Sequence, residues 1–183
     1  MVEFRVNSVV VQLMLGDIAD VEADAVVNAA NSSLLGGLGV DGAIHSKGGV
    51  KILEECKQIR ASMWPDGLPT GCAAITSGGN LKAKYVIHTV GPVWHGGLQG
   101  EAELLRQAYR NSLKLATVKG FKTIAFPSIS TGAYGYPIEE ASQVALKTVK
   151  NFLEKESTLE KISIVLFTEQ TFNTYLTAAK QIF

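Results

Sequence analysis

Two glycine-rich loops, each following an apolar run, contain the side chains best suited to chemistry. The first loop follows Asn28, is dense in glycine between residues 32 and 49, and carries an amide at Asn31 and a carboxylate at Asp41. Glycine has no Cβ, so the backbone there can approach a ligand closely. A helix beginning near Asp41 would point its first N–H groups at phosphate oxygens. Asn31 suits ribose hydroxyls because an amide both donates and accepts, and Asp41 can polarise a water or a hydroxyl.

The second loop spans Ser128–Pro137 and reads SISTGAYGYP. Its small residues open the backbone, Tyr134 could close over a sugar, and Pro137 suits the first position of a following helix. In an open α/β sheet, ligands bind outside the carboxyl ends of the strands. We therefore expect the two loops to form one crevice that accepts a phosphate-containing ligand.

Each candidate residue also has a simpler structural interpretation. Glycine-rich loops are often plain turns, and an Asp at a loop–helix junction is most often an N-cap, which applies to Asp41. Asn31 could serve as a turn or backbone-bridging amide, and Asn28, at a strand end, is expected to be structural. His45, one helical turn after Asp41, is expected to have a packing role.

Hydrophobic periodicity places alternating strands and helices around these loops. Alternation of this kind predicts an α/β fold, here a three-layer α/β/α sandwich with a mixed, mostly parallel central sheet, in one domain over residues 1–183. Strands are predicted at 8–15, 24–28, 72–77, 85–90, 123–128 and 161–167, and helices at 50–61, 101–119, 137–154 and 172–183.

Composition excludes several classes of protein. Lys and Arg together number 17, as do Asp and Glu, so the chain lacks the basic balance of a duplex-binding protein, although backbone amides could still hold a single nucleotide. Cys56 and Cys72 lack the spacing of a zinc or redox pair and are expected to be buried free thiols, and the histidines form no HxH or HExxH pattern, so no metal site is predicted. No signal peptide or long apolar segment is visible, and we expect a cytoplasmic protein without membrane contact.

Several motifs in this order resemble the macro domain family, specifically the MacroD-type ADP-ribosyl hydrolases. The resemblance spans nearly the whole chain and is much more specific than one glycine loop. The motifs are GDI at 16–18, VNAANSSLLGG at 27–37, GVDGAIH at 39–45, PTG at 69–71, KYVIHTVGPVW at 84–94 and PSISTGAYGYP at 127–137.

The resemblance implies a role for each site residue. Asp17 would accept a hydrogen bond from the adenine amino group, flanked by Ile18, and Phe167 would pack near the adenosine. Asn31 would orient the distal ribose, and Asp41 would position or activate the attacking water. The diphosphate and distal ribose would be enclosed by Ala29, Gly39, Val40, Ser130, Thr131, Gly132, Ala133 and Tyr134.

The chain departs from the family at Leu38, where a glycine is usual before Gly-Val-Asp. If Leu38 needs a positive φ, the backbone strain is of order ~1–2 kcal/mol. Alternatively, its side chain narrows the pocket for the distal ribose. Lys47 also departs from the family's usual residue, and we expect little effect if it faces solvent.

The family implies binding of ADP-ribose and hydrolysis of its esters, with no cofactor or metal. The expected substrates are mono-ADP-ribosyl esters on acidic side chains of proteins, and O-acetyl-ADP-ribose, which is deacetylated by the same chemistry. Two alternatives remain open: a non-catalytic reader of ADP-ribose, and an ADP-ribose 1″-phosphate phosphatase or binder of RNA ends.

Overall fold

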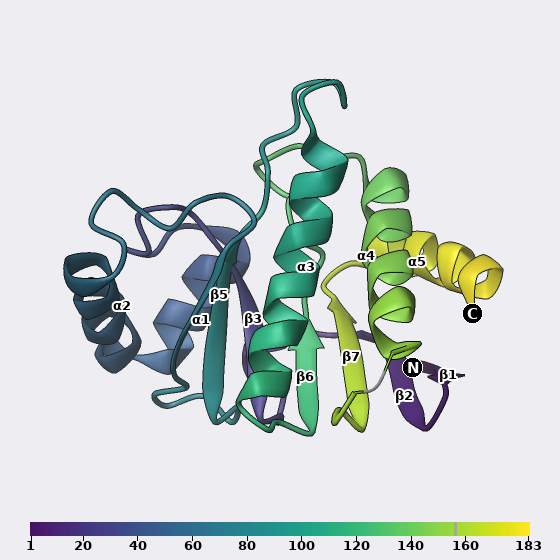
Figure 1. Cartoon of the computed structure of the whole chain (residues 1–183), viewed down its shortest axis with the longest axis horizontal. Helices are drawn as coiled ribbons and strands as arrows, with labels where there is room; N and C mark the ends of the chain where they lie inside the picture. The colour runs from purple at the N-terminus through teal and green to yellow at the C-terminus, as the bar shows by residue number, and fades with distance from the viewer. Residues whose placement is uncertain (156) are drawn as a thin grey trace.

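The structure is a computed structural model that describes residues 1–155 and 157–183. Over these residues the chain forms a seven-stranded sheet in the order β1-β2-β7-β6-β3-β5-β4 (Figure 1). The outer pairs β1/β2 and β4/β5 are antiparallel, and the inner pairs are parallel. The strands are β1 (Val2–Val6), β2 (Val9–Leu15), β3 (Ala25–Ala30), β4 (Ala73–Ser77), β5 (Tyr85–Val90), β6 (Thr123–Phe126) and β7 (Lys161–Leu166).

Helices cover both faces of the sheet. A 3-10 helix, η1 (Ile18–Asp20), packs on one face with α1 (Gly39–Gly48) and α2 (Val50–Ser62). The other face carries α3 (Glu101–Val118), α4 (Ile138–Leu153) and α5 (Glu169–Ile182) (Figure 1). The predicted three-layer sandwich with a mixed, mostly parallel sheet is therefore confirmed.

Differences from the predicted elements are small and have local causes. No element is predicted for the first seven residues, yet β1 forms there because Asn7 adopts φ 52° and pairs Val6 with Val9 across a two-residue turn. Helix α1 begins at Gly39, slightly before Asp41, and Pro137 is the N-cap of α4 rather than its first helical residue. Within the described residues, no helix combines the length and apolarity needed to cross a bilayer.

The strands β3 and β6 pair over only two residues of each strand, at the amino end of β3 and in the middle of β6. Their pairing is limited to Ala25 with Ile124 and Val26 with Ala125, although β3 continues to Ala30. The chain leaves β3 toward α1 on one face and leaves β6 toward α4 on the other face. Opposite crossovers at neighbouring strands mark the point where open α/β sheets form a ligand crevice.

Candidate functional site

A continuous cleft opens where β3 and β6 part. It consists of two adjoining cavities of about 530 and 400 Å³ that share Gly39, Val40, Ser128 and Gly132. The larger cavity contains Ala29, Asn31, Asp41, Ser130, Ala133 and Tyr134, and the smaller one contains Asp17, Ile18, Thr131 and Phe167. Every site residue predicted from the sequence thus lines this one cleft.

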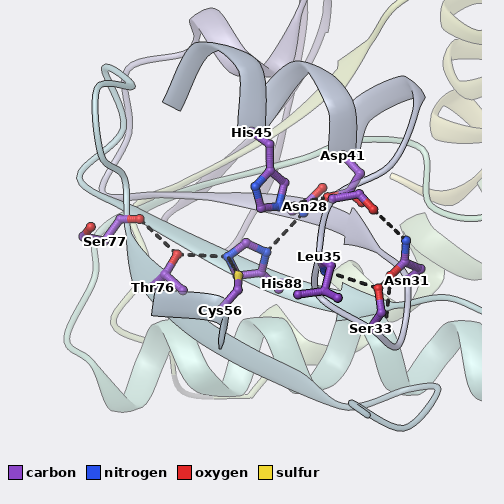
Figure 2. Close-up of polar contacts among 11 residues, drawn as sticks. Asn28, Asn31, Ser33, Leu35, Asp41, His45, Cys56, Thr76, Ser77 and His88 are labelled. Carbon is purple, nitrogen blue, oxygen red and sulfur yellow. Dashed lines mark hydrogen bonds and ion pairs between the residues drawn. The ribbon is translucent and has the colours of Figure 1, made fainter. Parts of the chain in front are cut away.

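The first wall of the cleft is the 31–38 loop, which Asn31 holds in shape. The Asn31 amide donates to the Gly36 carbonyl at 3.0 Å and accepts from the Ser33 backbone N–H at 3.1 Å (Figure 2). The predicted alternative, a backbone-bridging amide, is therefore present in the structure. Nδ2 carries two hydrogens and makes one hydrogen bond among the described residues, so the second hydrogen can be donated to a ligand.

Leu38 does not strain this loop. Its φ is −102°, so the alternative in which Leu38 strains the backbone does not apply, and the residue is 93% exposed at the rim of the larger cavity. The left-handed conformations fall instead on Gly36 (φ 91°), Gly39 (φ 60°) and the buried Leu34 (φ 57°). The branched side chain at position 38 is accommodated because the neighbouring glycines take the unusual backbone angles.

Asp41 lies in the first turn of α1 and is 5% exposed. It is not the N-cap: that position belongs to Leu38, which makes no side-chain capping bond. Asp41 Oδ1 accepts a 2.8 Å hydrogen bond from Asn28 Nδ2 and lies 3.3 Å from His45 Nε2. Its other oxygen faces Gly37, where the Cβ of any larger residue would lie 3.0 Å from Oδ2 and 3.4 Å from Asn31 Nδ2. Gly37 therefore keeps open the space between the amide and the carboxylate.

The second wall is the 128–137 loop, which its own backbone and two tyrosines hold. Ser130 is buried with φ 68°, and its carbonyl accepts from Tyr136 N at 2.9 Å. Tyr109 of α3 accepts from Ile129 N at 3.2 Å and donates to the Pro127 carbonyl at 3.1 Å. Tyr175 of α5 contacts Ser128 Oγ at 2.9 Å. Helices from the far layer thus fix the loop from behind.

The smaller cavity ends at Asp17 and Phe167. Asp17 caps η1 by accepting from Ala19 N at 2.9 Å, and Lys47 Nζ donates to its other oxygen at 2.9 Å. The hydrogen bond from the Lys47 ammonium holds the pKa of Asp17 below its ordinary value, so the carboxylate is charged at neutral pH. Lys47 is exposed to solvent, and its ammonium also bridges Asp17 and Asp20. Phe167 is 78% exposed, which leaves its ring free to stack on a flat ligand.

Backbone groups rather than cationic side chains must hold any anion here. No lysine or arginine lines either cavity in the described part of the chain. The amino end of α1 meets the cleft at Gly39 and Val40 without a side-chain cap, so its N–H groups and the positive end of its dipole are available. The site can therefore hold a diphosphate between the two glycine-rich loops.

His45, Cys56 and His88 cluster behind the cleft, with one ligand atom of each within 4.8 Å of the others. Both nitrogens of His88 already have partners, Asn28 at 3.1 Å and Thr76 at 2.9 Å. Burial, together with the charges of Asp41 and Glu55, raises the pKa of Cys56 to about 12, so this thiol keeps its proton. These contacts describe a hydrogen-bonded core better than a metal centre. Both cysteines are free as expected, but Cys72 is only half-buried.

The sequence indicated only structural roles for Asn28 and His45, did not single out Gly37, and marked Lys47 only as a departure from the family's usual residue. Asn28 is fully buried and donates directly to Asp41, so it belongs to the surroundings of the site. The sequence gives little indication of this contact, because it depends on how the fold places the end of β3 beside the start of α1. Lys47 could have been found from its position on α1, since it lies close to two turns after the glycine that begins the helix.

Comparison with known proteins agrees with this geometry. The macro domain family profile matches residues 27–145. The chain is 52% identical to the O-acetyl-ADP-ribose deacetylase of Klebsiella pneumoniae, covering 90% of this chain and 93% of that protein. It is 54% identical to a macro domain-containing protein of Caldanaerobacter subterraneus, covering 94% and 97%.

Solved structures agree as well. The Oceanobacillus iheyensis macrodomain with ADP superposes with a TM-score of 0.95 at 42% identity, covering 98% of this chain and 95% of that one. The Trypanosoma brucei macrodomain in complex with ADP-ribose superposes with a TM-score of 0.83 at 40% identity, covering 91% and 68%. On the profile match and these identities, the chain belongs to the macro domain family.

Proposed function

We propose that residues 1–183 act as one macro domain that binds ADP-ribose in the cleft and hydrolyses esters of its distal ribose. The substrates are O-acetyl-ADP-ribose and mono-ADP-ribosyl esters on acidic side chains of proteins. The observation that carries this proposal is that Asp41 Oδ2 and Asn31 Nδ2 both lie beside Gly37, at the end of a cleft lined with backbone donors. The relatives named as O-acetyl-ADP-ribose deacetylases, about half identical to this chain, support the same chemistry.

The cleft suggests an orientation for the ligand. Adenine occupies the smaller cavity, with its amino group at Asp17 and its ring against Phe167. The diphosphate lies over the residues that the two cavities share, where Gly39 and Gly132 allow close backbone approach. The distal ribose then enters the larger cavity, between Asn31, Asp41 and Tyr134. The charges place the diphosphate in the middle, away from the carboxylates at the two ends, and the exposed ring of Phe167 favours the smaller cavity for the adenine.

Hydrolysis then needs one water and one carboxylate. Asp41 Oδ2 accepts a hydrogen bond either from the attacking water or from a ribose hydroxyl that holds this water. The water attacks the ester carbonyl carbon. The bond between the carbonyl carbon and the ribose oxygen breaks, the ribose oxygen takes a proton that came from the water, and a free carboxylic acid leaves. Positioning and backbone N–H donors supply the rest of the catalysis, without a metal or a covalent enzyme intermediate.

The test compares the wild type with Asp41→Ala and with Asp66→Ala, an exposed carboxylate outside the cleft. We expect Asp41→Ala to lower the rate of acetate release from O-acetyl-ADP-ribose by roughly 10²–10⁴-fold, the usual contribution of a general base. Asp66→Ala should leave the rate unchanged. The same three proteins are then incubated with a protein that carries mono-ADP-ribosylated glutamates.

The outcomes separate the alternatives. A wild type that binds ADP-ribose by calorimetry but leaves both esters intact would be a reader. Release of phosphate from ADP-ribose 1″-phosphate faster than acetate release would indicate a phosphatase instead. Retained activity in Asp41→Ala would contradict the role given to this carboxylate.

A further inference from the structure

A chain of hydrogen bonds runs from Asp41 into the core, away from the cleft (Figure 2). Asn28 on β3 contacts both Asp41 Oδ1 at 2.8 Å and His88 Nδ1 at 3.1 Å. His88 on β5 is the register partner of Asn28, and its Nε2 lies 2.9 Å from Thr76 Oγ1 on β4. Thr76 in turn donates to the Ser77 carbonyl at 3.0 Å. Three strands thus connect to the carboxylate through side chains that are almost completely buried.

The carboxylate fixes the orientation of the Asn28 amide. An amide oxygen placed 2.8 Å from Asp41 Oδ1 would face a negatively charged acceptor, so the group at that position must be the NH₂. Both hydrogens of Nδ2 are then used, one by Asp41 and one by His88. The Asn28 Oδ1 atom is left buried without a hydrogen-bond partner among the described residues. A buried unsatisfied oxygen is unfavourable, which indicates that contact with Asp41 and His88 determines this orientation.

The tautomer of His88 follows from the amide. Burial, with a smaller contribution from the nearby His45 ring, lowers the pKa of His88 to about 3, so the ring is neutral and carries one N–H. Nδ1 accepts from Asn28, and the proton must therefore lie on Nε2. Nε2–H points at Thr76 Oγ1, whose own hydrogen goes to the Ser77 carbonyl. Cys56 Sγ also lies 3.8 Å from Nε2, farther away than Thr76 Oγ1. The opposite tautomer would bring two N–H groups together at 3.1 Å.

We propose that Thr76, His88 and Asn28 are positioning residues that hold the Asp41 carboxylate in one rotation, with Oδ1 tethered in the core and Oδ2 directed toward Asn31 and Gly37. This inference rests on the proposed hydrolase function, in which Oδ2 is the reacting oxygen. A carboxylate on a single-bonded side chain rotates readily unless one oxygen is held, since its terminal torsion is broad. Misplacement of a catalytic group by about 1 Å can cost on the order of 100-fold in rate.

Thr76 is the best residue to alter because it lies farthest from the cleft. Thr76→Val keeps the shape of the side chain but removes the acceptor of His88 Nε2–H, while Thr76→Ser retains the hydroxyl. The matched control is Thr89→Val, since Thr89 on β5 is also fully buried and donates to the Cys72 carbonyl at 2.8 Å, outside the chain of contacts to Asp41. Thr76→Val loses the hydrogen bonds to His88 Nε2–H and to the Ser77 carbonyl, and Thr89→Val loses one buried hydrogen bond. Thr76→Val should therefore be destabilised at least as much as Thr89→Val.

We expect Thr76→Val to lower kcat for O-acetyl-ADP-ribose roughly 5- to 20-fold with KM and the Kd of ADP-ribose nearly unchanged, because the lost interaction acts on the reacting group and not on ground-state binding. Thr76→Ser should restore kcat, and Thr89→Val should leave it near the wild-type value. Equal kcat values for Thr76→Val and Thr89→Val would overturn the positioning role.

A second measurement does not depend on activity. Long-range ¹H–¹⁵N NMR spectra of the imidazoles, assigned with His88→Gln, should show His88 protonated at Nε2 and bare at Nδ1. If the wild type proves inactive, the proposed hydrolase function fails, and the spectrum still decides whether the chain of contacts exists. A signal for protonated Nδ1 of His88 would overturn the inference even in an active enzyme.

Discussion

At the scale of single residues, the cleft depends on positions where a side chain is absent or exposed. Gly132 lies in the middle of the cleft, and a Cβ built there meets no atom within 4 Å. The packing of the protein would therefore allow a side chain at this position. The space is available for a ligand, and substitutions at Gly132 separate binding from folding.

Gly132→Glu should abolish ADP-ribose binding while the protein remains folded. The carboxylate would lie against the diphosphate, and like charges in contact cost several kcal/mol, which weakens affinity by roughly 100-fold or more. Calorimetry measures the affinity, and thermal unfolding checks the fold. Gly132→Ala, which adds a methyl without a charge, is the comparison and should bind ADP-ribose more tightly than Gly132→Glu. Unchanged affinity in Gly132→Glu would contradict the proposed location of the diphosphate.

Leu38→Ser should stabilise the protein. Leu38 occupies the N-cap of α1 with φ −102° and ψ 179° and makes no side-chain cap, whereas serine in this extended conformation can accept from the first turn. The expected gain in the free energy of unfolding is ~0.5–1 kcal/mol, and Tm should rise by about 2–4 °C. Leu38→Ala removes the same exposed side chain without adding a cap. Denaturation midpoints that do not differ between the two variants would count against a capping effect.

At the scale of elements, one carboxylate shapes the loop before α3. Glu101 is 1% exposed, and its carboxylate accepts from the backbone N–H groups of His95 at 2.8 Å, Gly97 at 3.2 Å and Gln99 at 2.8 Å. The same loop donates from Trp94 N to the Tyr134 carbonyl at 2.8 Å, which connects it to the second wall of the cleft. Burial alone would raise the pKa of Glu101, but the backbone N–H donors outweigh it and lower the pKa to about 2.

Glu101→Gln should be less stable than the wild type at neutral pH, and the difference should shrink in acid. Because the folded pKa of about 2 lies below the ordinary 4.5, the carboxylate stabilises the fold above pH 4.5, and this contribution is lost as the pH falls toward 2. Urea unfolding at pH 7 and at pH 3 measures the difference. Glu103→Gln, an exposed glutamate on the same helix, is the control. A pH-independent difference for Glu101→Gln would refute the assignment.

The elements and the location of the cleft could be predicted because they depend on local signals. Apolar runs bounded by glycine locate the strands, and parallel strands bring the loops after Asn28 and Phe126 to one edge. The contacts of Asn28 with His88 could not be predicted, since they require the strand order that places β5 beside β3. The contacts of Glu101 could not be predicted either, because its partners are backbone N–H groups and no residue type indicates the path of that loop.

At the scale of the whole molecule, helices α3 and α5, which lie on the face of the sheet opposite α1, hold the second wall of the cleft in place. Tyr109 of α3 and Tyr175 of α5 are fully buried and reach the 128–137 loop through their hydroxyls. These helices pack on the face opposite α1, so the cleft depends on both layers at once.

Tyr109→Phe should lower both stability and affinity. It leaves the Ile129 N–H and the Pro127 carbonyl without their buried partner, which costs about 1–3 kcal/mol in the free energy of unfolding. The loosened loop should bind ADP-ribose more weakly. Tyr85→Phe, at a ring that is 41% exposed, is the control and should change neither quantity. Normal affinity in Tyr109→Phe would show that the loop does not need this anchor.

The early parting of β3 and β6 has a consequence for the dynamics of the protein. Beyond Val26 and Ala125 the two strands exchange no hydrogen bonds, so the sheet contains a seam across which only loops and helices connect its halves. A nucleotide that forms hydrogen bonds to the loops after both strands would link the two halves of the sheet where the strands themselves do not pair. Hydrogen–deuterium exchange should therefore slow on both sides of the seam when ADP-ribose is added, and slowing confined to one side would mean that the ligand does not bridge it.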